Sequence, residues 1–157
     1  MTVLIVTTTD RPEPLTDWVG EGFRRVGAAV EALVLPDDLG ATGSVPSAGA
    51  TVGLRSDLRT YAGRFRGAEL VVYVTVTLSF ADTGGPYLRQ VSTWAEACAC
   101  PVIVAAQTTQ ISTRELRTVG VEAAYQAETE ADVARMVSTW MPAGSSRLRI
   151  ARAGAPA

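Results

Sequence analysis

Residues 70–76 read Leu-Val-Val-Tyr-Val-Thr-Val, and this stretch carries the strongest strand signal in the chain. It is apolar almost throughout and rich in β-branched residues, which is typical of a strand covered on both faces of a parallel sheet. Shorter runs of the same kind occur at residues 3–6, 30–35, 102–104 and 121–125. The sequence therefore predicts five parallel strands.

The segments between these strands carry apolar residues at helical spacing. In the first, which begins near Pro12 or Pro14, one face is formed by Leu15, Trp18, Val19, Phe23 and Val26. Further helices are predicted to begin at Ser56, Pro86, Ser112 and Thr129. Strands that alternate with helices predict an α/β fold. We expect a single open parallel five-stranded sheet in the order 2-1-3-4-5, Rossmann- or flavodoxin-like, with helices on both faces.

The length of 157 residues predicts one domain, which we place at residues 1–142. Residues 36–53 are rich in Gly, Ser, Pro and Ala, and this composition indicates a surface linker without a domain of its own. Residues 143–157 are small and Arg-bearing, so they are predicted to form a flexible C-terminal tail.

The composition excludes several kinds of chemistry. The chain has no His and no Lys, and all 14 basic residues are Arg. It therefore has no His-dependent triad, no His-ligated metal site and no phosphate-binding lysine. Cys98 and Cys100 are too close in sequence for an ordinary disulfide, and we interpret them as small buried groups. No metal and no cofactor are expected.

The charge and the termini suggest where the protein works. A net charge of −2 does not favour nucleic-acid binding. The N-terminus lacks the features of a signal peptide, and no apolar run is long enough to span a membrane. We therefore expect a cytoplasmic protein that binds a small-molecule substrate, with no nucleic-acid or membrane partner. A homodimer is a possible assembly.

Ligands of open parallel sheets bind outside the carboxyl ends of the strands. In this chain those ends are predicted to carry three polar loops, at residues 7–11, 77–85 and 107–110. Asp10 and Asp82 are the only carboxylates in these loops, so they are the candidate catalytic acid and base. The candidate substrate-binding residues are Thr8, Thr9, Arg11, Thr77, Ser79, Thr83, Gly84, Gln107 and Thr108. A structural interpretation of Asp10 and Asp82 as helix caps remains open beside the catalytic one.

Three segments resemble the C-terminal part of bacterial glycerate kinases in the same order. They are GAELVV at residues 67–72, CPVIVA at 100–105 and LRTVGVEAAY at 116–125. The N-terminal strand, helix and second strand are also similar to that family. The resemblance implies the family's α/β domain, with residues 36–53 standing where the family inserts its second domain.

The catalytic signatures of that family do not match. Ser79 stands where the family has an Asp, Gly85 replaces a Lys, and Gln107 replaces the Gly that ends the fourth strand. Phosphoryl transfer needs cationic groups and metal-held oxygens, so we expect the kinase reaction to be lost. The main hypothesis is therefore a degenerate glycerate-kinase-like enzyme that isomerises, dehydrates or cyclises a polar or acidic metabolite, with a role in specialised metabolite biosynthesis.

Two other hypotheses stay open. The first is a non-catalytic protein that binds a ligand or a partner chain, and the second is an active glycerate kinase. A flavin is also compatible with the predicted fold, but residues 7–11 lack the glycine of a flavodoxin phosphate loop.

Overall fold

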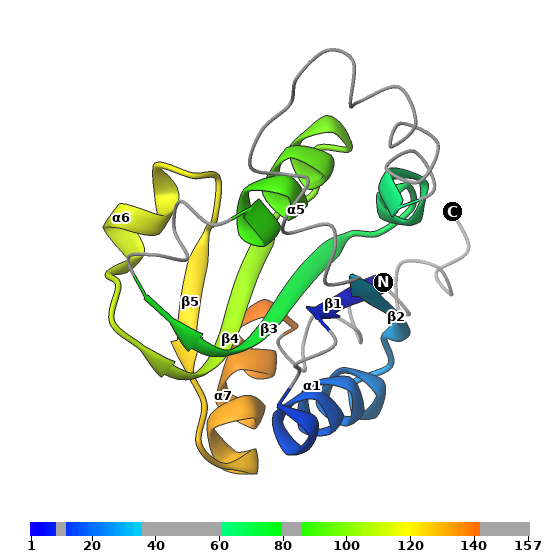
Figure 1. Ribbon diagram of the computed structural model, residues 1–157. Helices are drawn as coiled ribbons and strands as arrows, with labels where there is room; N and C mark the ends of the chain where they lie inside the picture. The colour runs from blue at the N-terminus through cyan, green and yellow to red at the C-terminus, as the bar shows by residue number, and fades with distance from the viewer. Residues whose placement is uncertain (9–11, 36–60, 80–85, 142–157) are drawn as a thin grey trace, which may run out of the picture.

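The computed structural model describes residues 1–8, 12–35, 61–79 and 86–141 (Figure 1). Its elements, in chain order, are β1 (Thr2–Thr8), α1 (Glu13–Arg25), β2 (Ala29–Leu35), β3 (Leu70–Leu78), α5 (Pro86–Ala97), β4 (Val102–Thr109), α6 (Thr113–Arg117), β5 (Ala123–Gln126) and α7 (Glu130–Trp140). Residues 61–65 are also helical. The predicted linker at 36–53 and the predicted tail at 143–157 lie outside the described residues.

The strands form one five-stranded sheet in the order β2-β1-β3-β4-β5, and all neighbouring strands are parallel. This arrangement confirms the fold class predicted from the sequence, which is the flavodoxin-like order of a doubly wound sheet. None of the helices in the described part of the chain has the length and apolar character needed to cross a membrane.

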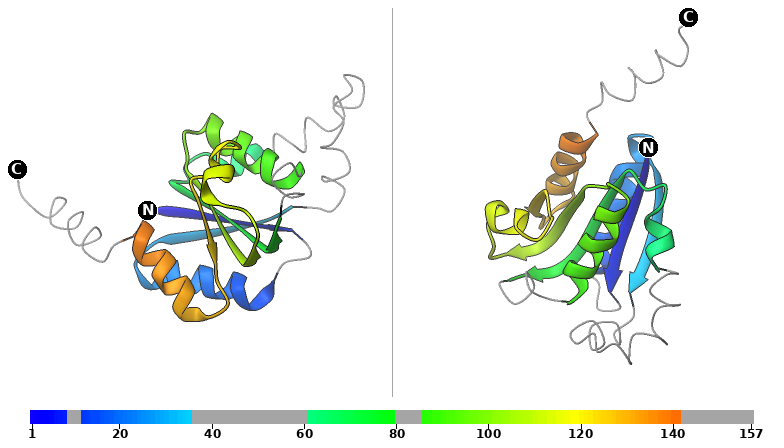
Figure 2. Two further views of the ribbon diagram at one scale, coloured as in Figure 1. Left: turned by 90° about the vertical axis from the view of Figure 1, so that its left-hand side faces the viewer. Right: turned by 90° about the horizontal axis from the view of Figure 1, so that it is seen from above.

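Helices cover both faces of the sheet (Figure 2). On one face, α1 and α7 pack against the sheet through Leu15, Val19, Phe23, Val133, Met136 and Val137. On the other face, α5, α6 and residues 61–65 contribute Phe65, Leu88, Val91, Trp94 and Leu116. Two apolar cores therefore lie on either side of a shared sheet.

Strand β3 belongs to both cores because successive side chains point to opposite faces. Leu70 and Val72 join the core beneath α1 and α7, whereas Val71 and Tyr73 join the core beneath α5. Full burial of one such aliphatic side chain contributes about 1.5–3 kcal/mol to stability, so this strand anchors both layers.

Helices α1 and α7 touch each other at a glycine. A Cβ atom at Gly22 would lie 3.1 Å from Cγ2 of Val137 and 3.5 Å from Cγ1 of Val133. The missing side chain therefore lets the two helices approach closely over the sheet.

Three strands are longer than the sequence analysis predicted. Thr7 and Thr8 belong to β1, Thr77 belongs to β3, and Gln107 to Thr109 belong to β4, although all were expected in loops. β-branched threonine suits a pleated strand, and Thr77 has Thr108 as its partner on the neighbouring strand. The polar residues therefore extend the sheet beyond its apolar centre.

Helix α5 ends in a conformation that usually requires glycine. Ala99 has a φ of 52°, and the amide of Cys100 donates to the carbonyl of Ala95 at 2.9 Å. The equivalent position after α1 is Gly27, with a φ of 92°. An L-residue pays a steric cost in this left-handed region, so Ala99 holds local backbone strain.

We predict that Ala99→Gly stabilises the domain by about 0.5–1 kcal/mol, because glycine removes the strain at a smaller entropic cost. The melting temperature should rise by a few degrees. Gly27→Ala is the matched reverse change and should lower the melting temperature. Its new Cβ would have no described atom within 4 Å apart from those of its chain neighbours, so only the backbone conformation is unfavourable. Thermal unfolding that shows Ala99→Gly to be less stable than the wild type would contradict this account of the α5 end.

Candidate functional site

The carboxyl edge of the sheet contains a notch between β1 and β3. Pairing of these strands runs from Val3 with Leu70 to Val6 with Tyr73. Pairing of β3 with β4 continues further, to Leu78 with Thr109. The last residues of β3 therefore have a neighbouring strand on one side only, within the part of the chain that the structure describes.

This notch lies where the strand order reverses, because β1 is followed in space by β2 on one side and β3 on the other. Open α/β sheets bind their ligands at such a switch point, outside the carboxyl ends of the strands. The notch is therefore the candidate site that the architecture defines.

The described residues around the notch are mostly neutral and hydrogen-bonding. Thr7 is almost fully buried at 2% exposure, and Thr75 is half-buried. Val76 is one of the two large exposed hydrophobic residues of the described chain, with 41% exposure. The edge thus combines hydroxyl groups with an accessible apolar side chain.

The structure brings several predicted site residues to this edge. Thr8, Ser79 and Gln107 are half-buried, whereas Thr77 and Thr108 are exposed partners on adjacent strands. The remaining predicted site residues are outside the described ranges. They are Thr9, Asp10, Arg11, Asp82, Thr83 and Gly84.

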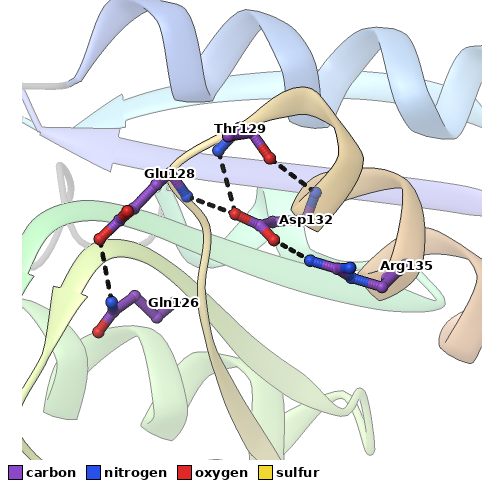
Figure 3. A network of polar contacts seen from close by, with 5 residues as sticks. All are labelled: Gln126, Glu128, Thr129, Asp132 and Arg135. Atoms are coloured by element: carbon purple, nitrogen blue, oxygen red, sulfur yellow. Dashed lines mark hydrogen bonds and ion pairs between the residues drawn. The ribbon is translucent and has the colours of Figure 1, made fainter.

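A polar network continues from this edge into α7, and Figure 3 shows its part from Gln126 to Arg135. The backbone amide of Thr109 donates to Oε1 of Gln126 at 3.2 Å, and Nε2 of Gln126 donates to Oε1 of Glu128 at 3.1 Å. The amide of Glu128 in turn donates to Oδ2 of Asp132 at 3.0 Å. The end of β4 is therefore joined, through the end of β5, to the first turn of α7.

Asp132 is the centre of the helical part of this network. It accepts from the amide of Thr129 at 3.1 Å, and its own amide donates to Oγ1 of Thr129 at 3.3 Å. Arg135 forms an ion pair with the other carboxylate oxygen. The amide hydrogen bond from Glu128, with help from Thr129 and Arg135, lowers the pKa of Asp132 below its ordinary value of 3.8. Asp132 therefore remains a carboxylate at neutral pH.

Sequence reasoning found only half of this network. The pattern of Thr129 and Asp132 predicted the start of α7, and the structure shows a capping box there. The contact of Gln126 with Thr109 joins residues from two strands, so no local motif indicated it. The structure describes no group of three or more His, Cys, Asp or Glu side chains that could hold a metal ion.

The opposite, amino edge of the sheet holds the buried thiol of Cys100. Burial is the main cause that raises its pKa to about 11, and the neighbouring Cys98 and Glu69 raise it further. Both cysteines are free, as the sequence predicted. The thiol of Cys100 stays protonated at neutral pH, so it is not poised as a nucleophile.

Comparison with known proteins supports the fold but not the family suggested by the sequence. No protein family matches the chain, and no curated protein matches it in sequence. A solved structure of an atypical orphan response regulator with a phosphorylation-independent regulatory mechanism is 14% identical, covers 90% of this chain and 95% of its own, and has a TM-score of 0.52. An orphan response regulator of H. pylori is 11% identical, covers 89% of this chain and 95% of its own, and has a TM-score of 0.46. The class that the first likeness defines is the flavodoxin-like receiver fold.

The resemblance to glycerate kinases is therefore wrong, and so is the degenerate kinase-like enzyme in biosynthesis inferred from it. The first of the two solved structures described above, with a TM-score of 0.52, is a response regulator and not a kinase. The segments behind the resemblance consist of strand and packing residues, and Leu70, Val71 and Ile103 within them are completely buried. Any buried parallel strand uses such residues, so they identify a fold rather than a family.

We predict that Asp132 stabilises the domain in a pH-dependent way. Because its pKa is lower in the folded state, its contribution to stability is complete above the ordinary pKa of 3.8 and is lost as the pH falls through the folded-state pKa. Asp132→Asn should therefore destabilise the protein at neutral pH, and its difference from the wild type should shrink on acidification. Urea unfolding at a series of pH values measures this difference.

Glu130→Gln is the control, because Glu130 lies in the same first turn but makes none of the hydrogen bonds of the network. It should lower stability less than Asp132→Asn. A difference between wild type and Asp132→Asn that stays constant down to about pH 2 would show that the carboxylate charge does not matter.

Proposed function

We propose that this chain is a non-catalytic regulatory domain with a receiver-like fold, which acts by binding another protein chain and needs no phosphorylation to do so. The fold likeness to an orphan response regulator with a phosphorylation-independent mechanism supports this proposal. It corresponds to the binding hypothesis left open by the sequence rather than to the enzymatic one.

The observation that carries the proposal is the edge of β3 at the notch, which is unpaired and has neutral side chains within the described residues. Its residues Thr75 to Leu78 have β4 on one side and no described partner strand on the other. Extended peptides bind such edges by adding a strand, with main-chain hydrogen bonds for affinity and side-chain contacts for specificity. The partner we propose is therefore a protein that offers an extended segment of neutral and apolar residues.

Two ionisable groups within the described residues have displaced pKa values. The pKa of Asp132 moves down and that of Cys100 moves up, so both move away from neutrality. General acid–base catalysis works best with a pKa near the operating pH. These two groups suit structural roles instead.

Several expectations from the sequence become part of this proposal. Thr8, Thr77, Ser79, Gln107 and Thr108 are proposed as contact residues for the partner, and residues 1–142 as the domain that carries them. A second copy of the chain is one partner to test. The cytoplasmic location stays a prediction.

We predict that Val76→Glu weakens partner binding, because it places a charge on the exposed apolar side chain of the notch. Val34→Glu is the matched control, since Val34 lies on β2 and is 39% exposed, against 41% for Val76. Each immobilised variant is incubated with an extract of the source cells and with the chain itself. A specific partner should be retained by the wild type and by Val34→Glu but lost with Val76→Glu. The purified partner should then bind the wild type and Val34→Glu more tightly than Val76→Glu.

The same extract tests the catalytic alternative. The free protein should leave the metabolites of the extract unchanged. The proposed function would be contradicted if the protein consumed many molecules of a metabolite per protein molecule. Equal retention of the partner by Val76→Glu and Val34→Glu would also contradict it.

A further inference from the structure

A second surface of interest is formed by the outer sides of α1 and α7. Both helices start at the carboxyl edge of the sheet and lead away from it side by side over the same face (Figure 2). A groove with a volume of about 190 Å³ lies between them. We call this groove, together with the exposed residues Asp17, Glu21 and Arg24 of α1 beside it, the α1–α7 face.

The groove exists because small residues line it. Gly22 on α1 and Ala134 on α7 leave room between the two helices, and Ala134 is exposed. The side chains of Trp18 and Val26 also line the groove and are only half-buried. Covering these apolar groups would remove them from water, so the groove favours a protein surface that fills it.

The exposed side of α1 carries opposite charges at its two ends. Asp17 lies near the start of the helix and Arg24 lies in its last turn, and both are exposed. They are two helical turns apart, which is about 10 Å along the axis. The described ion pairs of this helix and of α7 join Arg25 to Glu21 and Arg135 to Asp132, so neither Asp17 nor Arg24 has a partner among them.

This distribution of charge makes the face complementary to itself. Two copies could meet across a two-fold axis that runs along the helices, but Asp17 of one copy would then approach Glu130 of the other at the same end. An axis perpendicular to the helices instead sets the two α1 helices antiparallel, and Asp17 of each copy then meets Arg24 of the other. Opposite charges across an interface fix its orientation, and like charges exclude the alternative.

We propose that the α1–α7 face binds a second copy of this chain, with the two α1 helices antiparallel across a two-fold axis. The pairs of Asp17 with Arg24 set the orientation, and the apolar residues of the two grooves are covered where the copies meet. The face consists of α1 and α7, whereas the notch consists of strand edges, so this dimer does not depend on the partner proposed for the notch.

Sedimentation equilibrium of the full chain over a concentration series tests the charge pairs. The wild type should pass from monomer to dimer as its concentration rises. Asp17→Arg and Arg24→Glu should each weaken self-association about tenfold or more, because each creates two like-charge contacts across the axis. A mixture of the two variants should dimerise, since every reversed charge then meets an opposite one. Glu31→Arg, which makes the same charge change on β2 as Asp17→Arg, should dimerise like the wild type.

A second pair of variants tests the groove. Ala134→Glu places a charge in the groove and should abolish the dimer, whereas Ala131→Glu, at an exposed position of α7 outside the groove lining, should not. Both positions are exposed, so the thermal unfolding of the two monomers should be similar.

Val76→Glu separates this face from the notch and should dimerise like the wild type. Retention of the chain itself by immobilised Val76→Glu therefore reports the α1–α7 face and not the notch. A wild type that stays monomeric up to about 1 mM, or a mixture of Asp17→Arg and Arg24→Glu that associates no more than its components, would overturn the inference. A dimer that is lost in Val76→Glu but kept in Ala134→Glu would place the second copy at the notch and would overturn it too.

Discussion

The burial of β3 on both faces is the constraint on which the rest of the domain depends. The apolar side chains of residues 70–74 point to both faces of the sheet and are buried, so this part of β3 must have a helical layer above and below. The structure meets these needs with α1 and α7 on one face and α5, α6 and residues 61–65 on the other. Polar function is thereby confined to the two ends of the strands and to the turns.

The two ends differ in what they offer. Within the described residues, the side chains from Thr75 to Leu78 at the carboxyl end are neutral, and this part of β3 has β4 beside it on one side and no paired strand on the other. The hydrogen bonds from Thr109 through Gln126 and Glu128 to Asp132 join the ends of β4 and β5 to α7. The amino end holds the buried thiol of Cys100, whose pKa is raised to about 11 by burial.

The sequence predicted the strand order because apolar runs such as residues 70–76 alternate with helical segments, and connections between parallel strands are almost always right-handed. It placed the strand ends wrongly at Thr77 and Gln107, because a polar residue is accepted in a strand only when its cross-strand partner supports it, and pairing is a tertiary property. The notch depends on the register at which β1 stops pairing with β3, which no local pattern encodes. The family resemblance failed for a related reason, since buried strand residues are shared by unrelated parallel sheets.

We propose that this domain, which has a receiver-like fold, binds its partner without being phosphorylated. The most direct measurement is the intact mass and the ¹H–¹⁵N spectrum of the full chain after incubation with acetyl phosphate and Mg²⁺. The account predicts an unchanged mass and unchanged amide positions for Thr77 and Thr108 at the carboxyl edge. Stoichiometric addition of a phosphoryl group to an aspartate, together with shifts of these two amides, would contradict it.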